Sequence, residues 1–149
     1  MSVIVINVKS PLIDVSCDLQ LPTDHTGGLL GTGVSYADFN NDDIDDLTFG
    51  HHAGQLRFFQ GFIDETGAGF QEVTLNISNS QSEAKAVLWA DIDNDGDQDF
   101  LVTNRIAPNK LWRNDGGMQF TDISEFSEIS QDNTQRYGAS FGDFNTDGF

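Results

Sequence analysis

The chain has 149 residues and a formal net charge of −17, from 24 acidic and 7 basic side chains. This charge argues against nucleic acid or anionic membranes as partners, because both attract basic surfaces, and it favours a bound cation. A hydrophobic fraction of 38% with 11% aromatic residues indicates a folded domain with a core. The lone Cys17 cannot form an internal disulfide, and the apolar run at residues 3–6 is too short for a signal peptide or a membrane span.

An internal repeat organises the chain after its first thirty residues. Three segments align without gaps, at residues 33–42, 86–95 and 138–147. Their aspartates Asp38, Asp91 and Asp143 follow one another at intervals of 53 and 52 residues. Such a period indicates a repeat architecture. The chain then divides as follows: the tail of a preceding unit and a connection at 1–32, a first repeat at 33–85, a second at 86–137, and the truncated start of a third at 138–149.

Each full repeat is predicted to contain four short strands. The first strand, rich in small and aromatic residues, leads into a loop of aspartate and asparagine, and the second strand follows it at 46–49 or 99–102. The third and fourth strands are predicted at 55–59 and 70–75, around a loop at 61–69, and at 110–113 and 118–123, around a turn at 114–117. Four short strands in about fifty residues are typical of one β-propeller blade.

The predicted fold is therefore all-β, with about two and a half blades, each a four-stranded antiparallel sheet. A propeller needs at least about four blades to close. We therefore expect either a fragment of a larger ring or a protomer that associates with copies of itself through its open ends.

In the second repeat, oxygen-bearing residues occupy alternate positions of a nine-residue loop. Calcium takes about six to eight oxygen ligands, and such spacing can supply them. The predicted ligands are the side chains of Asp91, Asp93, Asp95 and Asp99 and the backbone carbonyl of Asp97. Gly96 stands where the chain must turn sharply.

The other two loops follow the same pattern with departures. In the first loop the predicted ligands are the side chains of Asp38, Asn40, Asp42 and Asp46 and the carbonyl of Ile44. Asp43 replaces the turn glycine there, and because aspartate tolerates left-handed backbone, we expect a filled but weaker site. The third loop offers Asp143, Asn145 and Asp147 but lacks a ninth-position carboxylate. The sequence thus predicts two calcium sites and an incomplete third.

Competing motifs are weaker. A single Asp/Asn/Gly run is usually a polar turn, but three copies at one phase of a repeat favour metal binding. An EF-hand would need glutamate at position 12, where Phe49 and Val102 stand. Ser140 lies in a G-x-S-x-G sequence, but its place in the repeat makes it part of a first strand, and an Asp/Asn loop follows instead of a helix. His51 and His52 lack a third ligand for zinc. We predict no catalytic residue.

The two tryptophans offer a test of carbohydrate binding, because exposed indoles can stack on sugars. Trp89 shares its repeat position with Tyr36 and Phe141, which favours packing in a core. Trp112 lies in a short predicted third strand, where core packing is again the simpler interpretation. Sugar or protein binding by these side chains stays open as the alternative.

The loops also carry a family resemblance. The pattern of small or aromatic strand residues, then Asp-Phe-Asn-x-Asp-Gly, then Asp-Leu or Asp-Phe resembles the FG-GAP repeats of integrin α-subunit propellers and the bacterial VCBS and FG-GAP-like repeats, with Asp43 as a departure. Residues 109–123 resemble the blade ending of bacterial VCBS-type and cartilage-acidic-protein-like members. The resemblance covers about 33–149.

This resemblance implies a seven-bladed propeller that is extracellular, cell-surface or periplasmic. It also implies structural calcium and a non-catalytic role in adhesion or protein binding. Two alternatives stay open: a lectin-like carbohydrate-binding propeller, and a non-catalytic propeller appended to a secreted hydrolase or lyase. The protein or glycan ligand is not specified by the sequence, and no membrane insertion is expected.

Overall fold

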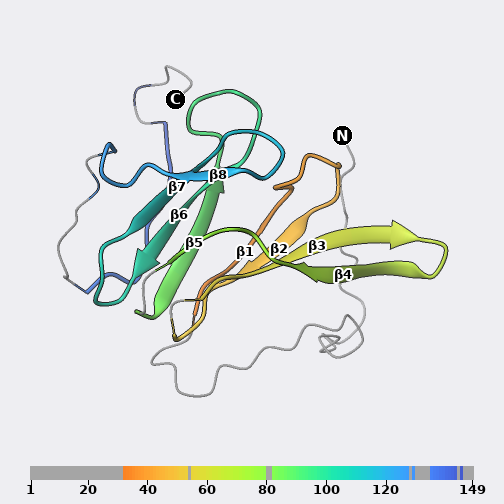
Figure 1. The fold of residues 1–149 in the computed structure, drawn as a ribbon, viewed down its shortest axis with the longest axis horizontal. Coiled ribbons are helices and arrows are strands. Elements are labelled where there is room, and N and C mark those ends of the chain that lie inside the picture. Colours follow the sequence, from red (N-terminus) through yellow and green to blue (C-terminus); the bar gives the residue numbers. More distant parts are fainter. Residues whose placement is uncertain are drawn as a thin grey trace.

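The computed structural model describes residues 32–53, 55–79, 82–127, 129, 135–143 and 145. These residues form two antiparallel sheets of four strands, in the orders β1-β2-β3-β4 and β5-β6-β7-β8. Each strand therefore pairs with its neighbours in sequence, as in a propeller blade, and we call the sheets the first and second blade (Figure 1). The described residues contain no helix, and so none that could cross a membrane. The prediction of an all-β fold built from blades is confirmed.

The strands lie close to their predicted positions. The first blade contains β1 (Val34–Ala37), β2 (Asp46–Phe49), β3 (Arg57–Asp64) and β4 (Gly67–Val73). The second contains β5 (Ala84–Ala90), β6 (Asp99–Asn104), β7 (Lys110–Asn114) and β8 (Phe120–Asp122). The proposed repeat boundaries stay a prediction, although β5 begins two residues before the boundary at residue 86.

The predicted loop at 61–69 is wrong. Strands β3 and β4 pair through this region, down to Asp64 opposite Gly67. The turn is short because Asp64 Oδ1 accepts hydrogen bonds from the backbone N–H and the hydroxyl of Thr66, at 2.7 and 2.6 Å. An aspartate that bonds two residues ahead can replace a longer loop. The resulting hairpin extends beyond the rest of the blade (Figure 1).

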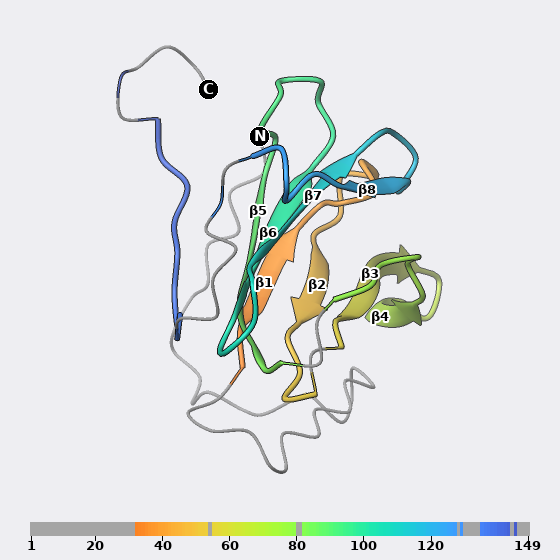
Figure 2. The same ribbon diagram turned by 60° about the vertical axis from the view of Figure 1, so that its left-hand side comes forward.

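Aromatic side chains from the two blades pack against each other and form the core. Phe39 stacks on Trp89 with 5.3 Å between ring centroids, and Phe58 contacts Phe100 at 5.9 Å. All but Trp89 are almost fully buried. The Trp89 Nε1–H donates to Thr48 Oγ1 on β2 at 3.2 Å, so its polar atom is satisfied inside the seam. The first strands of the blades, β1 and β5, lie side by side (Figure 2).

Glycine allows the backbones of the two blades to meet at one end of this seam. A Cβ at Gly33 would lie 2.7 Å from the Cα of Ala86, which is too close for any other residue. Gly50 donates its N–H to the Gly33 carbonyl at 2.8 Å, and a Cβ there would lie 2.8 Å from the carbonyl oxygen of Ala84. The close approach of the blades therefore depends on both residues.

The aromatic residues that share a repeat position differ in exposure. Trp89 lies in the seam, whereas Tyr36 is 62% exposed. Both side chains lie on the equivalent face of their sheet, since Tyr36 pairs with Leu47 as Trp89 pairs with Phe100. In the second blade this face meets the first blade, whereas in the first blade it lies opposite to Thr48 and so points away from the second blade. Phe141 is also exposed, whereas Trp112 is buried as predicted.

The described part of the third repeat contains no strand. Residues 138–142 align with β1 and β5, yet they pair with no other segment in the described residues. In the two blades, the first strand pairs with a second strand that starts at Asp46 or Asp99, eight residues after the first aspartate. The predicted segment 1–32 lies outside the described residues except for Thr32.

We predict that Phe58→Ala lowers the free energy of unfolding by about 3–5 kcal/mol, because it leaves a cavity between the blades. Phe126→Ala is the control, since Phe126 is 85% exposed, and its effect should stay within about 0.5 kcal/mol. Urea denaturation measures both values. Similar losses for the two variants would contradict the proposed core.

Candidate metal centre

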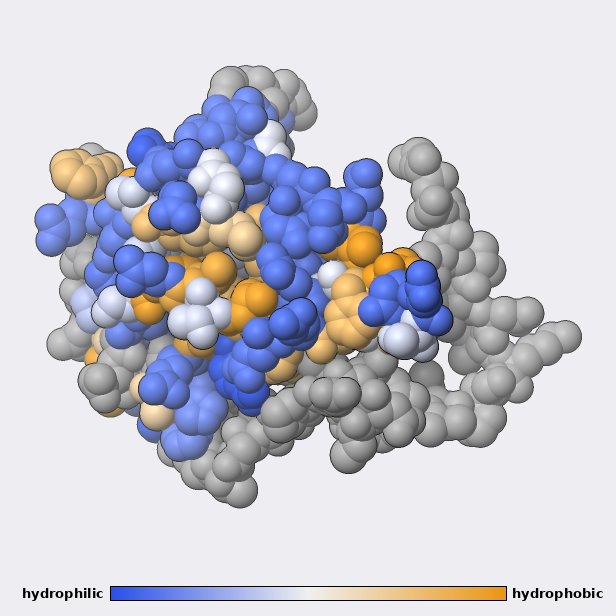
Figure 3. Space-filling view, turned by 45° about the vertical axis from the view of Figure 1, so that its right-hand side comes forward, coloured by the Kyte–Doolittle hydropathy of each residue, from blue (hydrophilic) through white to orange (hydrophobic). Residues whose placement is uncertain are grey.

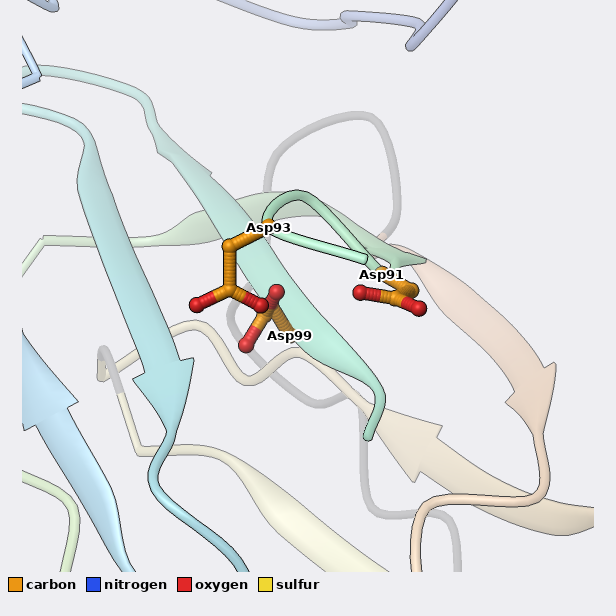
Figure 4. A group of neighbouring side chains, drawn as sticks. All are labelled: Asp91, Asp93 and Asp99. Atoms are coloured by element: carbon orange, nitrogen blue, oxygen red, sulfur yellow. The ribbon is translucent and has the colours of Figure 1, made fainter. Parts of the chain in front are cut away.

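Three aspartate carboxylates meet where β5 passes into β6. Asp91, Asp93 and Asp99 each place an oxygen within 4.8 Å of the others (Figure 4). The pairing of Ala90 with Asp99 brings the two ends of the loop together, and Asp93 extends from the loop toward Asp99. Three carboxylates this close repel one another unless a cation or protons neutralise them. Their hard oxygens fit the ligand chemistry of calcium.

The aspartate at the first position of each loop folds that loop around its own carboxylate. Asp38 accepts hydrogen bonds from the backbone N–H groups of Asp42 and Asp43, at 3.0 and 2.8 Å. Asp91 accepts the equivalent bonds from Asp95 and Gly96, at 3.1 and 3.0 Å. The first-position aspartates of the two loops thus accept equivalent backbone hydrogen bonds.

The aspartate at the ninth position ties the loop to the third strand. Both carboxylates, Asp46 and Asp99, are completely buried. Each accepts one N–H from the loop and one from the third strand, as follows: Phe39 (3.0 Å) and Gly61 (2.9 Å) for Asp46, and Ile92 (2.8 Å) and Asn114 (2.8 Å) for Asp99. One carboxylate therefore holds the loop, the second strand and the third strand together.

The third-strand donor differs between the blades. A Cβ at Gly61 would lie 2.5 Å from the carbonyl oxygen of Asp45, so the first blade requires glycine there. The second blade has Asn114 at the equivalent position, and its side-chain amide donates to the carbonyl of Gln98 at 3.5 Å. The sequence pattern did not identify either residue as part of the site, because the bond comes from a backbone N–H.

Burial raises the pKa of the Asp46 carboxyl to about 6 from its ordinary 3.8. The hydrogen bonds from Gly61 and Phe39 lower that pKa, and the charges of Asp42 and Asp38 raise it further. Burial likewise raises the pKa of Asp99, and the nearby charges of Asp93 and Asp95 add to that rise. Both ninth-position carboxylates are therefore costly to ionise without a cation beside them.

Two positions of each loop have left-handed backbone. At position six, Asp43 has a φ of 68° and Gly96 a φ of 94°, so Asp43 does adopt the conformation expected of the turn glycine. At position four, Asn41 and Asn94 have φ values of 59° and 57°. Position four was not predicted to be left-handed, although asparagine in both loops is a signal for this conformation.

The remaining predicted ligands lie in the loops but outside the acidic group of three. The position-five carboxylates of Asp42 and Asp95 each accept the backbone N–H of the position-seven residue, Ile44 or Asp97, at 2.9 Å. Asn40 replaces the third-position carboxylate in the first loop, and its amide donates to Asp42 Oδ2 at 2.9 Å. The assignment of all these residues as metal ligands stays a prediction.

The third loop is described only in part. Asp143 and Asn145 are exposed and are not members of the acidic group. Asp147 lies outside the described residues. The incomplete third site also stays a prediction.

We predict that Gly96→Ala destabilises the protein by about 1–2 kcal/mol, because alanine resists left-handed backbone. No atom lies within 4 Å of a Cβ built at this residue, so the effect would come from the backbone alone. Gly138→Ala is the control, since Gly138 has equal space and no left-handed φ, and it should change stability by less than about 0.5 kcal/mol. Equal melting temperatures for the two variants would show that the turn is not constrained.

A pH titration tests the buried carboxylate. In the presence of a chelator, the Asp46 side-chain carbon should titrate in NMR spectra with a midpoint near 6. Asp115 is the internal control, because hydrogen bonds from Thr121 and Arg113 lower its pKa. Since the pKa of Asp46 is higher in the folded state, its contribution to stability is fully present below pH 3.8 and is lost as the pH rises toward 6. An ordinary midpoint for Asp46 would contradict its burial.

Comparison with known families agrees with this geometry. Residues 91–149 match the family model described as the FG-GAP-like repeat. The match begins at Asp91, the first residue of the acidic group, and it confirms the resemblance for this part of the chain. No curated protein matches the chain.

Proposed function

Because residues 91–149 contain an FG-GAP-like repeat, we propose that the chain supplies calcium-stabilised blades to an extracellular β-propeller that binds a protein partner. The observation that carries this proposal is the repeated loop scaffold. The same backbone hydrogen bonds hold the first-position and ninth-position aspartates of both blades. The acidic group of the second loop lies within that scaffold. We infer no catalytic activity for these blades.

Calcium would act as a structural ion in this function. In the second loop, Asp91, Asp93 and Asp99 would hold it together with Asp95 and the carbonyl of Asp97. When bound, the ion neutralises carboxylates that repel one another. Because these ligands come together only in the folded chain, binding stabilises the fold.

The first loop would bind calcium more weakly. Its ligands would be Asp38, Asn40, Asp42, Asp46 and the carbonyl of Ile44. Asn40 stands where the second loop has Asp93, so this set has one carboxylate fewer. A lower ligand charge reduces the affinity for calcium.

Hollows along the outer part of the seam support a role in protein binding. One, of about 600 Å³, is lined by residues of β3, β4 and the connection 74–79. A second, of about 420 Å³, lies between that connection and the β7–β8 turn, and Thr74 and Leu75 line both. Figure 3 shows apolar side chains gathered in the middle of one face within a hydrophilic border. Such a mixture suits a peptide segment with apolar side chains.

The face of the first blade turned away from the seam supports the need for further blades. Val34 and Tyr36 are 55% and 62% exposed on β1. They alternate with residues that face the second blade, and a preceding blade would cover them. We propose that these blades come from the same longer chain or from further copies.

Carbohydrate binding gains no support from the tryptophans. Trp112 is 6% exposed, and Trp89 packs between Phe39 and Phe100 in the seam. Neither indole presents a free platform on which a sugar could stack. We therefore prefer a protein partner.

Calcium binding is tested by thermal unfolding in chelator and in millimolar calcium. The melting temperature should rise in calcium, because ligand at about 100 times its Kd stabilises by about 2.7 kcal/mol. In Asp93→Asn, the calcium affinity of the second site should fall about tenfold in calorimetric titration. Asp93 is exposed, so this substitution removes a charge without opening a cavity.

Asp45→Asn is the matched control. Asp45 is exposed, and its substitution by asparagine removes the same charge from a position of the first loop that is not a predicted ligand. Its calcium affinity should stay within about twofold of the unmodified chain. Identical melting temperatures of the unmodified chain in chelator and in calcium would overturn the metal role.

A further inference from the structure

A hydrogen bond joins the metal loops of the two blades. Asn41 in the first loop donates from Nδ2 to Asp97 Oδ1 in the second at 2.6 Å, and the same nitrogen lies 3.4 Å from the carbonyl oxygen of Gly96. The partners are 56 and 55 residues apart in sequence. This contact is separate from the aromatic seam, and it links the two candidate metal centres directly.

Both acceptors belong to the turn that closes the second loop. The Gly96 N–H is held by Asp91 Oδ2 at 3.0 Å, and the Asp97 N–H by Asp95 Oδ1 at 2.9 Å. Asp91 is a member of the acidic group, and Asp95 is a predicted ligand. An ion that fixes these two aspartates therefore also fixes the turn to which Asn41 is bonded.

The residue type at position 41 meets two demands at once. Its backbone is left-handed, with a φ of 59°, which asparagine adopts at less cost than most residues. Its side chain must also donate to a carboxylate. Aspartate would meet the first demand but would repel Asp97, and glycine would meet the first but has no donor.

The carboxylate of Asp97 has no counterpart in the first loop. The equivalent residue is Ile44, which has no side-chain oxygen. The side chain of Asp97 is thus not part of the repeated ligand pattern, in which position seven contributes only a carbonyl. It accepts a hydrogen bond from the neighbouring blade instead.

From this geometry we propose that Asn41 is a positioning residue that couples calcium binding in the two loops. The inference rests on the proposed calcium function. Calcium in the second loop immobilises the turn at residues 96–97, and the bonded Asn41 then restricts the first loop before its own ion binds. Less conformational entropy is lost when that ion binds, so its affinity rises, and by linkage the first ion raises the affinity of the second equally.

Calorimetric calcium titration of the full chain tests the coupling. Asn41→Gly keeps the left-handed backbone but removes the donor, and Asp97→Ala removes the acceptor. Each should lower the calcium affinity of the first loop about fivefold, which is the lower end of typical coupling between sites. The double variant should lose no more than either single variant. Asp97→Asn, which keeps an acceptor oxygen, should retain most of the affinity.

A second background separates coupling from a local effect on the first loop. In the background Asp93→Asn/Asp95→Asn the second loop keeps two of its four ligand carboxylates, one fewer than the first loop, so the first loop fills before it. At calcium concentrations that leave this second loop empty, Asn41→Gly should have no effect on the first-loop affinity. A fivefold loss in that background would overturn the coupling and assign Asn41 a local role.

The outcomes also separate the coupling from the proposed function. If both loops of the unmodified chain bind calcium and Asn41→Gly leaves both affinities unchanged, the coupling is wrong and the calcium function stands. If the unmodified chain binds no calcium, both fail. Amide hydrogen exchange gives a readout without affinities: filling the second loop at low calcium should slow exchange at residues 38–46 in the unmodified chain, and not in Asn41→Gly.

Discussion

The structure depends on one buried carboxylate in each blade. Asp46 and Asp99 have no exposed surface. Each accepts one hydrogen bond from the aspartate-rich loop of its own blade and another from the third strand. A neutral side chain of similar shape cannot accept two N–H groups in this way, because an amide offers only one acceptor oxygen. The charged form accepts both bonds most strongly, yet burial disfavours it. A cation bound beside the carboxylate, as proposed above, would resolve this conflict, and the fold and the candidate metal centre would then be parts of one arrangement.

The second constraint is that a blade cannot bury its faces alone. Phe58 belongs to the first blade and Phe100 to the second, and the two rings contact each other. Removing one blade would expose to solvent the ring of the other. The exposure of Tyr36 shows the same requirement on the far side of the first blade. Stability in such a repeat protein comes from the contacts between neighbours as well as from each unit. The loop contact between Asn41 and Asp97 adds a polar link to the apolar one.

The sequence predicted those features that recur with the period. Strand β2 and the positions of Asp91, Asp93 and Asp99 could be read from alternation and spacing, because local chain geometry decides them. The hairpin at 61–69 could not, since its two-residue turn depends on the side chain of Asp64. The Asn41–Asp97 contact was also missed, because it joins residues that only the packing of the blades brings together. The structure was thus predictable where both blades share one pattern, and not where a single side chain or the packing of the blades decides it.

The difference between Gly61 and Asn114 has a consequence for how such repeats can be exchanged. The backbone N–H of each donates the equivalent hydrogen bond to the ninth-position aspartate, so this bond alone would allow the two third strands to be exchanged. A Cβ at residue 61, however, would lie 2.5 Å from the carbonyl oxygen of Asp45, whereas the second blade accommodates a full side chain there. Third strands therefore cannot be swapped without their own loops. The unit that can be duplicated or grafted is the loop together with the second and third strands, and its limits do not coincide with the limits of a sequence repeat.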